Sequence, residues 1–142
     1  MKLSTKCRYG TRAMIEIARN YYKGPTKRKE IAASQDISEG YLENILSRLK
    51  NQHLVRTVRG ANGGFVLEKK PGEITLYEIV IALEGSISPV DCIINTDICG
   101  KVSNCSARKA WQKLHLAQIK VLSDITLEDL IPMEPDAPSY EI

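Results

Sequence analysis

Three cysteines in the second half of the chain have the residue type and spacing to do chemistry. Cys92, Cys99 and Cys105 are separated by six and five residues, in a stretch without helical or strand periodicity. This spacing differs from the two-residue pairs of zinc ribbons and from the redox Cys-x-x-Cys motif. Three thiolates on one loop can hold a soft metal centre, and an iron–sulfur cluster needs a fourth ligand as well. Zinc binding and unligated thiols stay open as alternatives.

The fourth cysteine, Cys7, lies far from the other three, early in a predicted first helix. Its charged neighbours Lys6 and Arg8 lead us to expect that it is exposed. A cysteine at this place is either an ordinary small side chain or a further thiol ligand. The other candidates for a fourth ligand are an external thiol, water, Asp91 and Asp97.

The stretch from Thr26 to Leu67 contains the elements on which the rest of the chain depends. A short helix from about Lys27 to Ser34 is followed by a turn, and Ser38 is a good N-cap for a second helix. The apolar residues of that helix share one face, which predicts that they are buried: Leu42, Ile45, Leu46 and Leu49. Two strands, 54–59 and 65–67, are joined by Gly-Ala-Asn-Gly-Gly, whose Asn-Gly favours a hairpin because both residues accept positive φ.

This order of elements predicts a mainly α fold, a winged helix-turn-helix with a two-stranded wing. Such a unit lays its second helix in the DNA major groove. Residues 1–60 hold thirteen Lys and Arg against five Asp and Glu, whereas residues 61–142 hold seven against twelve. A basic half of this kind indicates a polyanionic partner, which we take to be double-stranded DNA. The candidate DNA contacts on the outer side of the second helix and on the wing are Tyr41, Asn44, Arg48, Lys50, Arg56, Arg59 and Gly63.

The remaining elements follow from caps and periodicity. A first helix is expected from Ser4 or Thr5 to about Tyr22, and the capping-box pattern at 75–78 opens a helix to about Glu84. The helix expected at 106–123 is apolar on two faces, so one face should pack against a second copy of the chain. The domain boundaries that result are 1–85 for the DNA-binding domain, 86–105 for a cysteine-bearing loop, 106–131 for a dimerisation helix with a short return helix, and 132–142 for an extended tail.

Length and composition narrow the class of protein. At 142 residues the chain is one domain or a domain with an appendage, and its 43% of hydrophobic residues is ordinary for a globular protein. We expect a cytoplasmic protein, since no apolar run is long enough to span a membrane and no charged-then-apolar leader opens the chain. Its two histidines, His53 and His115, are isolated, and no nucleophile–base motif accompanies them, so an enzyme is not expected.

Several short motifs together resemble one known family. They are Met-Lys-Leu-Ser-Thr-Lys at the start, Arg8-Tyr9, Ile37-Ser38, Tyr41-Leu42-Glu43, Leu54-Val55, Val58-Arg59-Gly60, Gly63-Gly64 and Thr126-Leu-Glu-Asp-Leu130. The chain resembles, over nearly its whole length, the dimeric winged-helix transcription regulators typified by the iron–sulfur cluster regulator IscR, the nitric-oxide sensor NsrR and the cysteine-metabolism repressor CymR. The resemblance implies a homodimer that binds a palindromic operator. It also implies that Tyr41, Glu43 and Arg59 read DNA and that the three clustered cysteines hold an iron–sulfur cluster, 2Fe–2S or 4Fe–4S.

The sequence departs from the cluster-binding members in two ways. Those members usually space all three cysteines by five residues, and the IscR type has a His ligand where this chain has Arg108, which cannot bind a metal at ordinary pH. In the nitric-oxide sensors a ligand comes from the first helix of the partner subunit, which here offers Cys7. The segment 84–90 and the final Tyr-Glu-Ile are closer to the cysteine-metabolism repressor. An alternative function is therefore a repressor without a cluster that works with cysteine synthase through the terminal Ile142.

Overall fold

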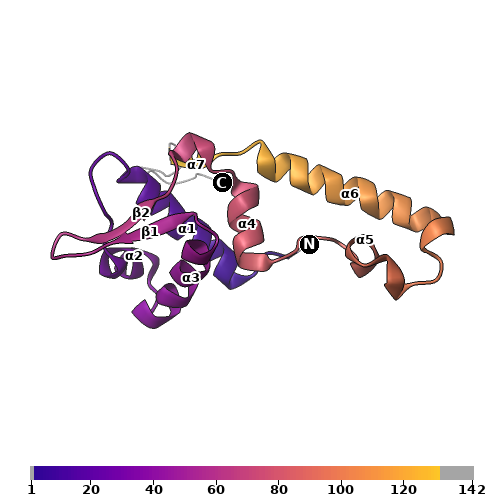
Figure 1. Ribbon diagram of the computed structural model, residues 1–142, viewed down its shortest axis with the longest axis horizontal. Coiled ribbons are helices and arrows are strands. Elements are labelled where there is room, and N and C mark those ends of the chain that lie inside the picture. Colours follow the sequence, from indigo (N-terminus) through magenta and orange to yellow (C-terminus); the bar gives the residue numbers. More distant parts are fainter. Residues whose placement is uncertain (1, 132–142) are drawn as a thin grey trace, which may run out of the picture.

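The structure is a computed structural model and describes residues 2–131. Its helices and strands form a rounded body, from which an arm made of α5 and α6 extends (Figure 1). Their bounds are α1 Thr5–Arg19, α2 Arg28–Gln35, α3 Glu39–Asn51, β1 Val55–Val58, β2 Gly64–Leu67, α4 Leu76–Glu84, α5 Asp91–Ile94, α6 Ser106–Ser123 and α7 Leu127–Leu130. The predicted mainly α fold with a two-stranded wing is confirmed. No helix in this part of the chain is long and apolar enough to cross a membrane.

Side-chain caps decide where the helices begin. The Ser38 hydroxyl accepts a hydrogen bond from the Tyr41 amide at 3.1 Å, as expected for the first turn of α3. Thr75 and Thr126 open α4 and α7 with capping boxes. Ser4 caps α1, but this helix ends at Arg19 rather than at the expected Tyr22. The Asn20 amide closes the last turn on the carbonyls of Ile17 and Ala18, and the chain then turns toward the sheet.

One hydrophobic core holds the body together. The apolar face predicted for α3 is fully buried: Leu42, Ile45, Leu46 and Leu49. It lies in one cluster with residues of α1, α2 and α4, among them Met14, Ile17, Ile31, Ile79 and Leu83. The core therefore fixes α3 relative to the helices behind it.

A hydrogen-bonded contact joins the amino end of α1 to the end of α4. The amide and hydroxyl of Ser4 both donate to a Glu84 carboxylate oxygen, at 2.8 and 2.5 Å. Burial alone would raise the pKa of Glu84, but the hydrogen bonds from Ser4, with smaller contributions from Cys7 and the Lys6 charge, together lower that pKa.

The wing is an antiparallel hairpin with Val55 opposite Leu67 and Val58 opposite Gly64. Strand β1 is one residue shorter at each end than the expected 54–59, and β2 begins one residue earlier than the expected 65–67. The predicted hairpin is confirmed, and within it Gly60 (φ 112°) and Gly64 (φ 157°) take positive φ, whereas Asn62 and Gly63 do not. Gly63 is needed for a different reason, since a Cβ there would overlap the Val58 carbonyl oxygen.

A third segment supports the base of the wing. Thr26 forms an antiparallel bridge with Phe65, with N–O distances of 3.0 and 2.8 Å. Gly64 allows this contact, because a Cβ at that position would lie 2.5 Å from the Thr26 carbonyl oxygen. The wing is thus attached to the loop that leads into α2, and not only to α3.

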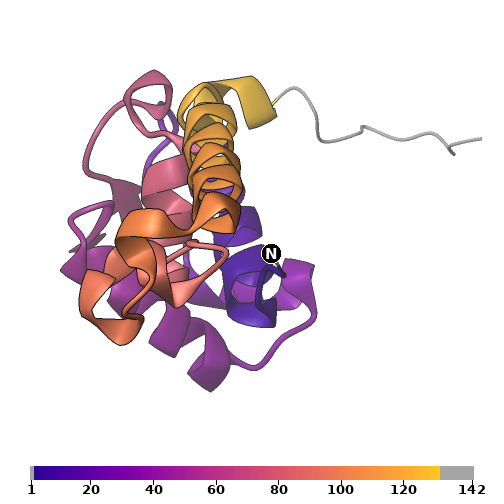
Figure 2. The same ribbon diagram turned by 90° about the vertical axis from the view of Figure 1, so that its right-hand side faces the viewer.

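The arm consists of the cysteine-bearing segment and α6, which runs back toward the body (Figures 1 and 2). The bounds of α6 agree with the sequence prediction, and none of its residues is buried. Ile119 and Leu122 pack against the core, whereas Trp111, Leu114 and Val121 are 42%, 44% and 59% exposed. The segment before α6 is not a plain loop, because it contains α5 and short 3-10 turns at 96–98 and 102–104. The expected tail at 132–142, with Ile142, lies outside the described residues.

Candidate nucleic-acid interface and cysteine segment

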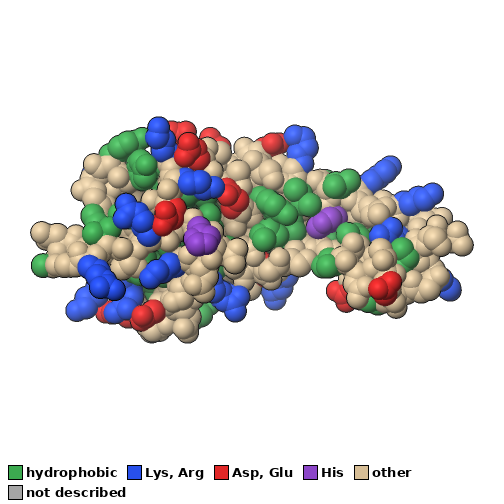
Figure 3. All heavy atoms as spheres, in the orientation of Figure 1, with side chains coloured by type: hydrophobic (Ala, Val, Ile, Leu, Met, Phe, Trp, Pro, Cys, Tyr) green, Lys and Arg blue, Asp and Glu red, His purple; other side chains and the backbone are tan. Residues whose placement is uncertain are grey.

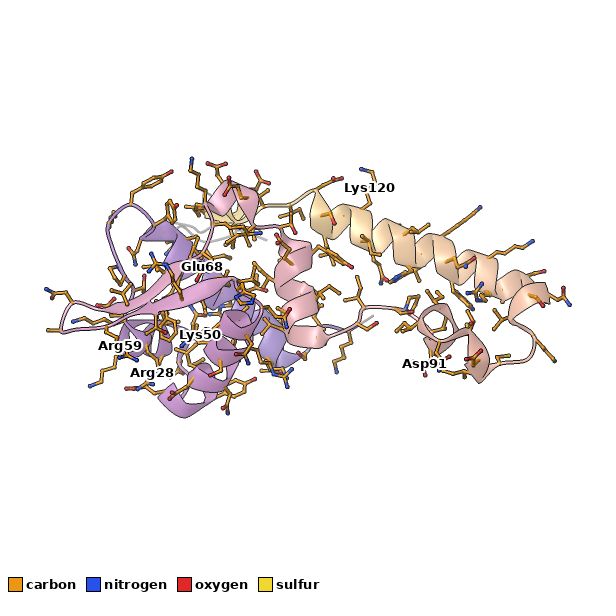
Figure 4. The ribbon with its side chains drawn as sticks, viewed as in Figure 1. Arg28, Lys50, Arg59, Glu68, Asp91 and Lys120 are labelled. Carbon is orange, nitrogen blue, oxygen red and sulfur yellow. The ribbon has the colours of Figure 1, made fainter. Side chains whose placement is uncertain are left out.

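A basic groove lies between α2, α3 and the wing. Its volume is about 360 Å³, and its lining includes the backbone of Gly63 and Gly64 and five charged side chains, Lys27, Arg28, Lys29, Glu43 and Lys50. Arg28, Lys50 and Arg59 lie at the same end of the molecule (Figure 4), where basic side chains gather on the surface (Figure 3). Four cations and one carboxylate around an open groove provide a surface that a phosphate backbone can approach.

The candidate residues of α3 divide between two directions. Glu43 and Lys50 line the groove and are exposed. Tyr41 points the other way, with its ring edge-on to Tyr9 at a centroid distance of 6.2 Å. Arg48 is exposed, but its guanidinium lies 3.5 Å from the Leu83 carbonyl oxygen. Asn44 is exposed on α3, and Arg56 and Arg59 are exposed on the wing.

The sequence interpretation missed the basic side chains of α2 as part of this site. Lys27, Arg28 and Lys29 stand at the amino end of that helix and line the groove. The Lys-Arg-Lys run was visible in the sequence, but only the packing of α2 against α3 brings it to the same groove as Glu43. Arg28 forms ion pairs with Glu43 at 2.7 Å and with Glu39 at 3.3 Å.

The family assignment rests on a match that covers the body and the arm. Residues 3–133 match the family described as Rrf2, iron-dependent transcriptional regulator. The chain belongs to the Rrf2 family. It is 43% identical over 130 residues to the HTH-type transcriptional regulator CymR of Bacillus subtilis, covering 92% of this chain and 89% of that one. It is 34% identical over 131 residues to the HTH-type transcriptional regulator IscR of Photorhabdus laumondii, covering 92% of this chain and 79% of that one.

Solved structures agree with this assignment. The structure of CymR from B. subtilis has a TM-score of 0.81 at 41% identity, covering 95% of this chain and 99% of that one. The T. potens IscR structure has a TM-score of 0.77 at 33% identity, covering 99% and 93%. This Rrf2 chain is therefore a transcriptional regulator and not an enzyme, as the sequence predicted.

The three clustered cysteines of the Rrf2 chain lie on the arm. Cys92 is half-buried in α5, Cys99 is exposed, and Cys105 is half-buried at the start of α6. Arg108, for which the resemblance implied a His ligand in related chains, donates from Nε and Nη2 to the Cys92 carbonyl oxygen, both at 3.4 Å. Between residues 2 and 131, no three His, Cys, Asp or Glu side chains are grouped closely enough to hold a metal ion. The three thiols are all free and supply soft donors, so they fit a cluster in chemistry, although they are not gathered around one point.

Cys7 lies elsewhere and in a different environment. The expectation that it is exposed is wrong, because it is 1% exposed in the core. It continues the buried stripe of α1 through Gly10, Met14 and Ile17, and this spacing was present in the sequence. Burial, and then the nearby carboxylate of Glu84, raise the pKa of the Cys7 thiol to about 11. A thiol enclosed in the core of its own subunit is not presented to a cluster on the arm of a partner subunit, so this burial argues against Cys7 as the fourth ligand.

Proposed function

We propose that this chain is a homodimeric, cytoplasmic transcription regulator that reads a palindromic operator with α3 and the wing. The basic groove between α2, α3 and the wing carries this proposal, because its cations and exposed glycine backbone suit a phosphate backbone. Glu43, Asn44, Lys50, Arg56 and Arg59 are the exposed side chains proposed to contact DNA. Tyr41, Arg48 and Gly63 complete the set of residues proposed to contact DNA, although Tyr41 also contacts Tyr9 and Arg48 also donates to the Leu83 carbonyl oxygen.

A second copy of the chain is proposed to pack on α6. Exposed apolar residues follow one side of that helix at helical spacing: Ala107, Ala110, Trp111, Leu114, Ala117 and Val121. An exposed apolar stripe of this length is typical of a protein–protein contact. Pairing about a two-fold axis would present two α3 helices to two half-sites of one operator.

We further propose that Cys92, Cys99 and Cys105 hold an iron–sulfur cluster that controls operator affinity. The family description as iron-dependent and the IscR relatives support this proposal, together with the three free thiols on one segment. When bound, the cluster supplies a centre that responds to iron supply and redox state. The chain's own contribution is to present the thiols beside α6, with Arg108 attaching the Cys92 backbone to that helix. The fourth ligand is then Asp91, Asp97, an external thiol or water.

The second candidate function is a repressor of cysteine metabolism that needs no cluster. The 43% identity to CymR favours it, and so does the absence of a ready metal-binding group among residues 2–131. In that case the partner would be cysteine synthase, bound through the terminal Ile142. Colour separates the two candidates, because only the first should yield a brown protein under anaerobic conditions.

The proposed DNA contact is tested at Arg59. Its planar fork suits a narrow minor groove or a guanine edge, so Arg59→Ala should weaken binding by about 1–3 kcal/mol. Lys50→Ala should cost less and should reduce the slope of log K against log salt by about 0.9. The measurement is fluorescence anisotropy with a duplex that the wild-type protein has selected from random-sequence DNA. Lys113→Ala on α6 is the control, and an unchanged affinity for a folded Arg59→Ala chain would contradict the assignment.

The proposed cluster is tested by absorbance of protein made anaerobically. The wild-type chain should be brown, and Cys99→Ala should be colourless but still dimeric. Cys7→Ala serves as the matched control, and its spectrum should equal that of the wild-type protein because the thiol is buried in the core. A colourless wild-type protein that binds one zinc per chain would rule out the cluster and leave the DNA-binding proposal intact.

A further inference from the structure

Two carboxylates stand on the first turns of α3, at the edge of a groove that should receive a polyanion. Glu39 and Glu43 are one helical turn apart, and Glu43 also lines the groove. Like charges at this spacing repel each other, and both would repel a phosphate backbone. A recognition helix with this composition needs a nearby cation that offsets both charges.

Arg28 of α2 supplies that cation with defined geometry. Its Nη1 atom lies 2.7 Å from Oε2 of Glu43, and its Nη2 atom lies 3.3 Å from Oε2 of Glu39. One guanidinium therefore uses its two terminal nitrogens for two carboxylates, an arrangement that Lys cannot reproduce with a single ammonium group. Arg28 Nε is buried, without a hydrogen-bond partner among residues 2–131, so the two terminal nitrogens make the described polar contacts of this guanidinium.

Stability does not explain this arrangement. The side chains of Arg28, Glu39 and Glu43 are 38%, 42% and 60% exposed. Ion pairs this exposed contribute little to the free energy of folding, because water and salt screen them. The position of Arg28 and Glu43 in the lining of the groove indicates a role in what the groove binds.

We propose that Arg28 is a positioning residue for the sequence selectivity of this regulator, because it holds Glu43 against α2 and so determines which base edge Glu43 reaches. The inference rests on the proposed DNA-binding function. Oε2 of Glu43 is engaged by Arg28, whereas Oε1 has no partner in the part of the chain that the structure describes. A carboxylate oxygen left free in this way can accept a hydrogen bond from the amino group of cytosine. Without Arg28, the Glu43 side chain rotates freely and its charge, with that of Glu39, faces the phosphates.

A direct phosphate contact by Arg28 would behave differently. In that case, removing Arg28 would weaken binding by the same factor whether or not position 43 carries a charge. Base preference would stay the same, because phosphate contacts carry no sequence information. A double-mutant cycle between positions 28 and 43 therefore separates the two roles.

The experiment uses the full-length protein and a pool of random-sequence duplex DNA, from which each variant selects its preferred sites. Arg28→Gln should change the preferred base at one position of each half-site and weaken binding to the wild-type site by about 5- to 100-fold. In a Glu43→Gln chain, the same Arg28→Gln change should weaken binding by a clearly smaller factor, close to that of Lys29→Ala, and should leave the base preference unchanged, because the carboxylate that Arg28 orients is gone and only one groove cation and its offset of Glu39 are lost. Arg28→Lys, which keeps the charge without the fork, should recover part of the affinity but not the base preference.

Lys29→Ala is the matched control. Lys29 is exposed and lines the same groove, but it forms no ion pair with a described residue. Its replacement by alanine removes one positive charge, as Arg28→Gln does. It should lower affinity without changing base preference. Equal losses for Arg28→Gln in both backgrounds, with unchanged base preference, would overturn the role assigned to Arg28 and leave the proposed function standing. A folded wild-type protein that enriches no sequence would overturn the proposed function itself, and with it this inference.

Discussion

A chain that carries Trp111→Glu and Leu114→Glu should be monomeric and should bind its operator at least ~100-fold more weakly than the wild-type chain. Both side chains are more than two-fifths exposed on the stripe of α6 that is proposed to meet a second copy. Burying a large apolar side chain contributes about 1.5–3 kcal/mol, and each residue occurs twice in a two-fold dimer. With the double substitution, the dimer would lose the free energy gained from burying these apolar side chains. It would also have to bury two unpaired negative charges in each subunit.

The loss of operator affinity should be large because the two subunits of a dimer bind the two half-sites together. A dimer that holds one half-site binds the second as an intramolecular event, which strengthens binding by about 10²- to 10⁴-fold. Sedimentation velocity measures the oligomeric state, and anisotropy on full and half operators measures the coupling. Lys113→Glu on the same helix is the control and should stay dimeric. A dimeric double variant with wild-type affinity would show that subunits pair through another surface.

Gly63→Ala should destabilise the wing by about 1–3 kcal/mol, the usual cost of forcing extra volume into a packed site. The added methyl group would overlap the Val58 carbonyl oxygen, which is backbone and cannot rotate away. The turn must therefore open, and the hydrogen bond from the Gly63 amide to the Gly60 carbonyl, 3.0 Å in length, should weaken. Urea unfolding should report the loss of stability, and operator affinity should fall with it.

Gly40→Ala provides the comparison for this wing substitution. Gly40 lies in the first turn of α3, where an added Cβ would meet no atom within 4 Å apart from its chain neighbours and the backbone of its own helix, and its φ is not in the left-handed region. Alanine in a helix is more stable than glycine by about 0.5–1 kcal/mol, so this change should be neutral or slightly stabilising. If Gly63→Ala and Gly40→Ala had the same free energy of unfolding in urea, the close contact between residue 63 and the Val58 carbonyl oxygen would not constrain the turn.

Features encoded locally were predictable from the sequence. The start of α3 at Ser38 and the bounds of α6 depend on caps and apolar spacing within a few residues, and both agree with the structure. The burial of Cys7 could also have been predicted from the sequence, because Cys7 lies three residues before Gly10 and seven before Met14, on the same buried face of α1. Its charged neighbours suggested exposure, although they lie on the other sides of the helix.

Features that depend on tertiary packing were not predictable in this way. Arg28 and Glu43 are fifteen residues apart, and their ion pair exists because α2 packs across α3. The positive φ of Gly60 and Gly64 depends on the register of the hairpin and on Thr26, which lies far away in sequence. The Asn-Gly signal predicted that a turn would form but not which glycines would bear the unusual backbone angles.

The length of α6 sets a mechanical condition on any control that starts at the cysteines. Its 18 residues make a rigid rod of about 27 Å, with Cys105 at the far end and the body at the near end. A sideways shift of about 1 Å at Cys105 turns such a rod by only about 2°. When α6 turns as a rigid rod, the displacement that reaches the body is no larger than the displacement of Cys105 at its far end. To move a recognition helix by several ångströms, the far end must itself travel that distance. We expect the segment before α6, with its short 3-10 turns, to do so by refolding rather than by a small adjustment of rigid parts.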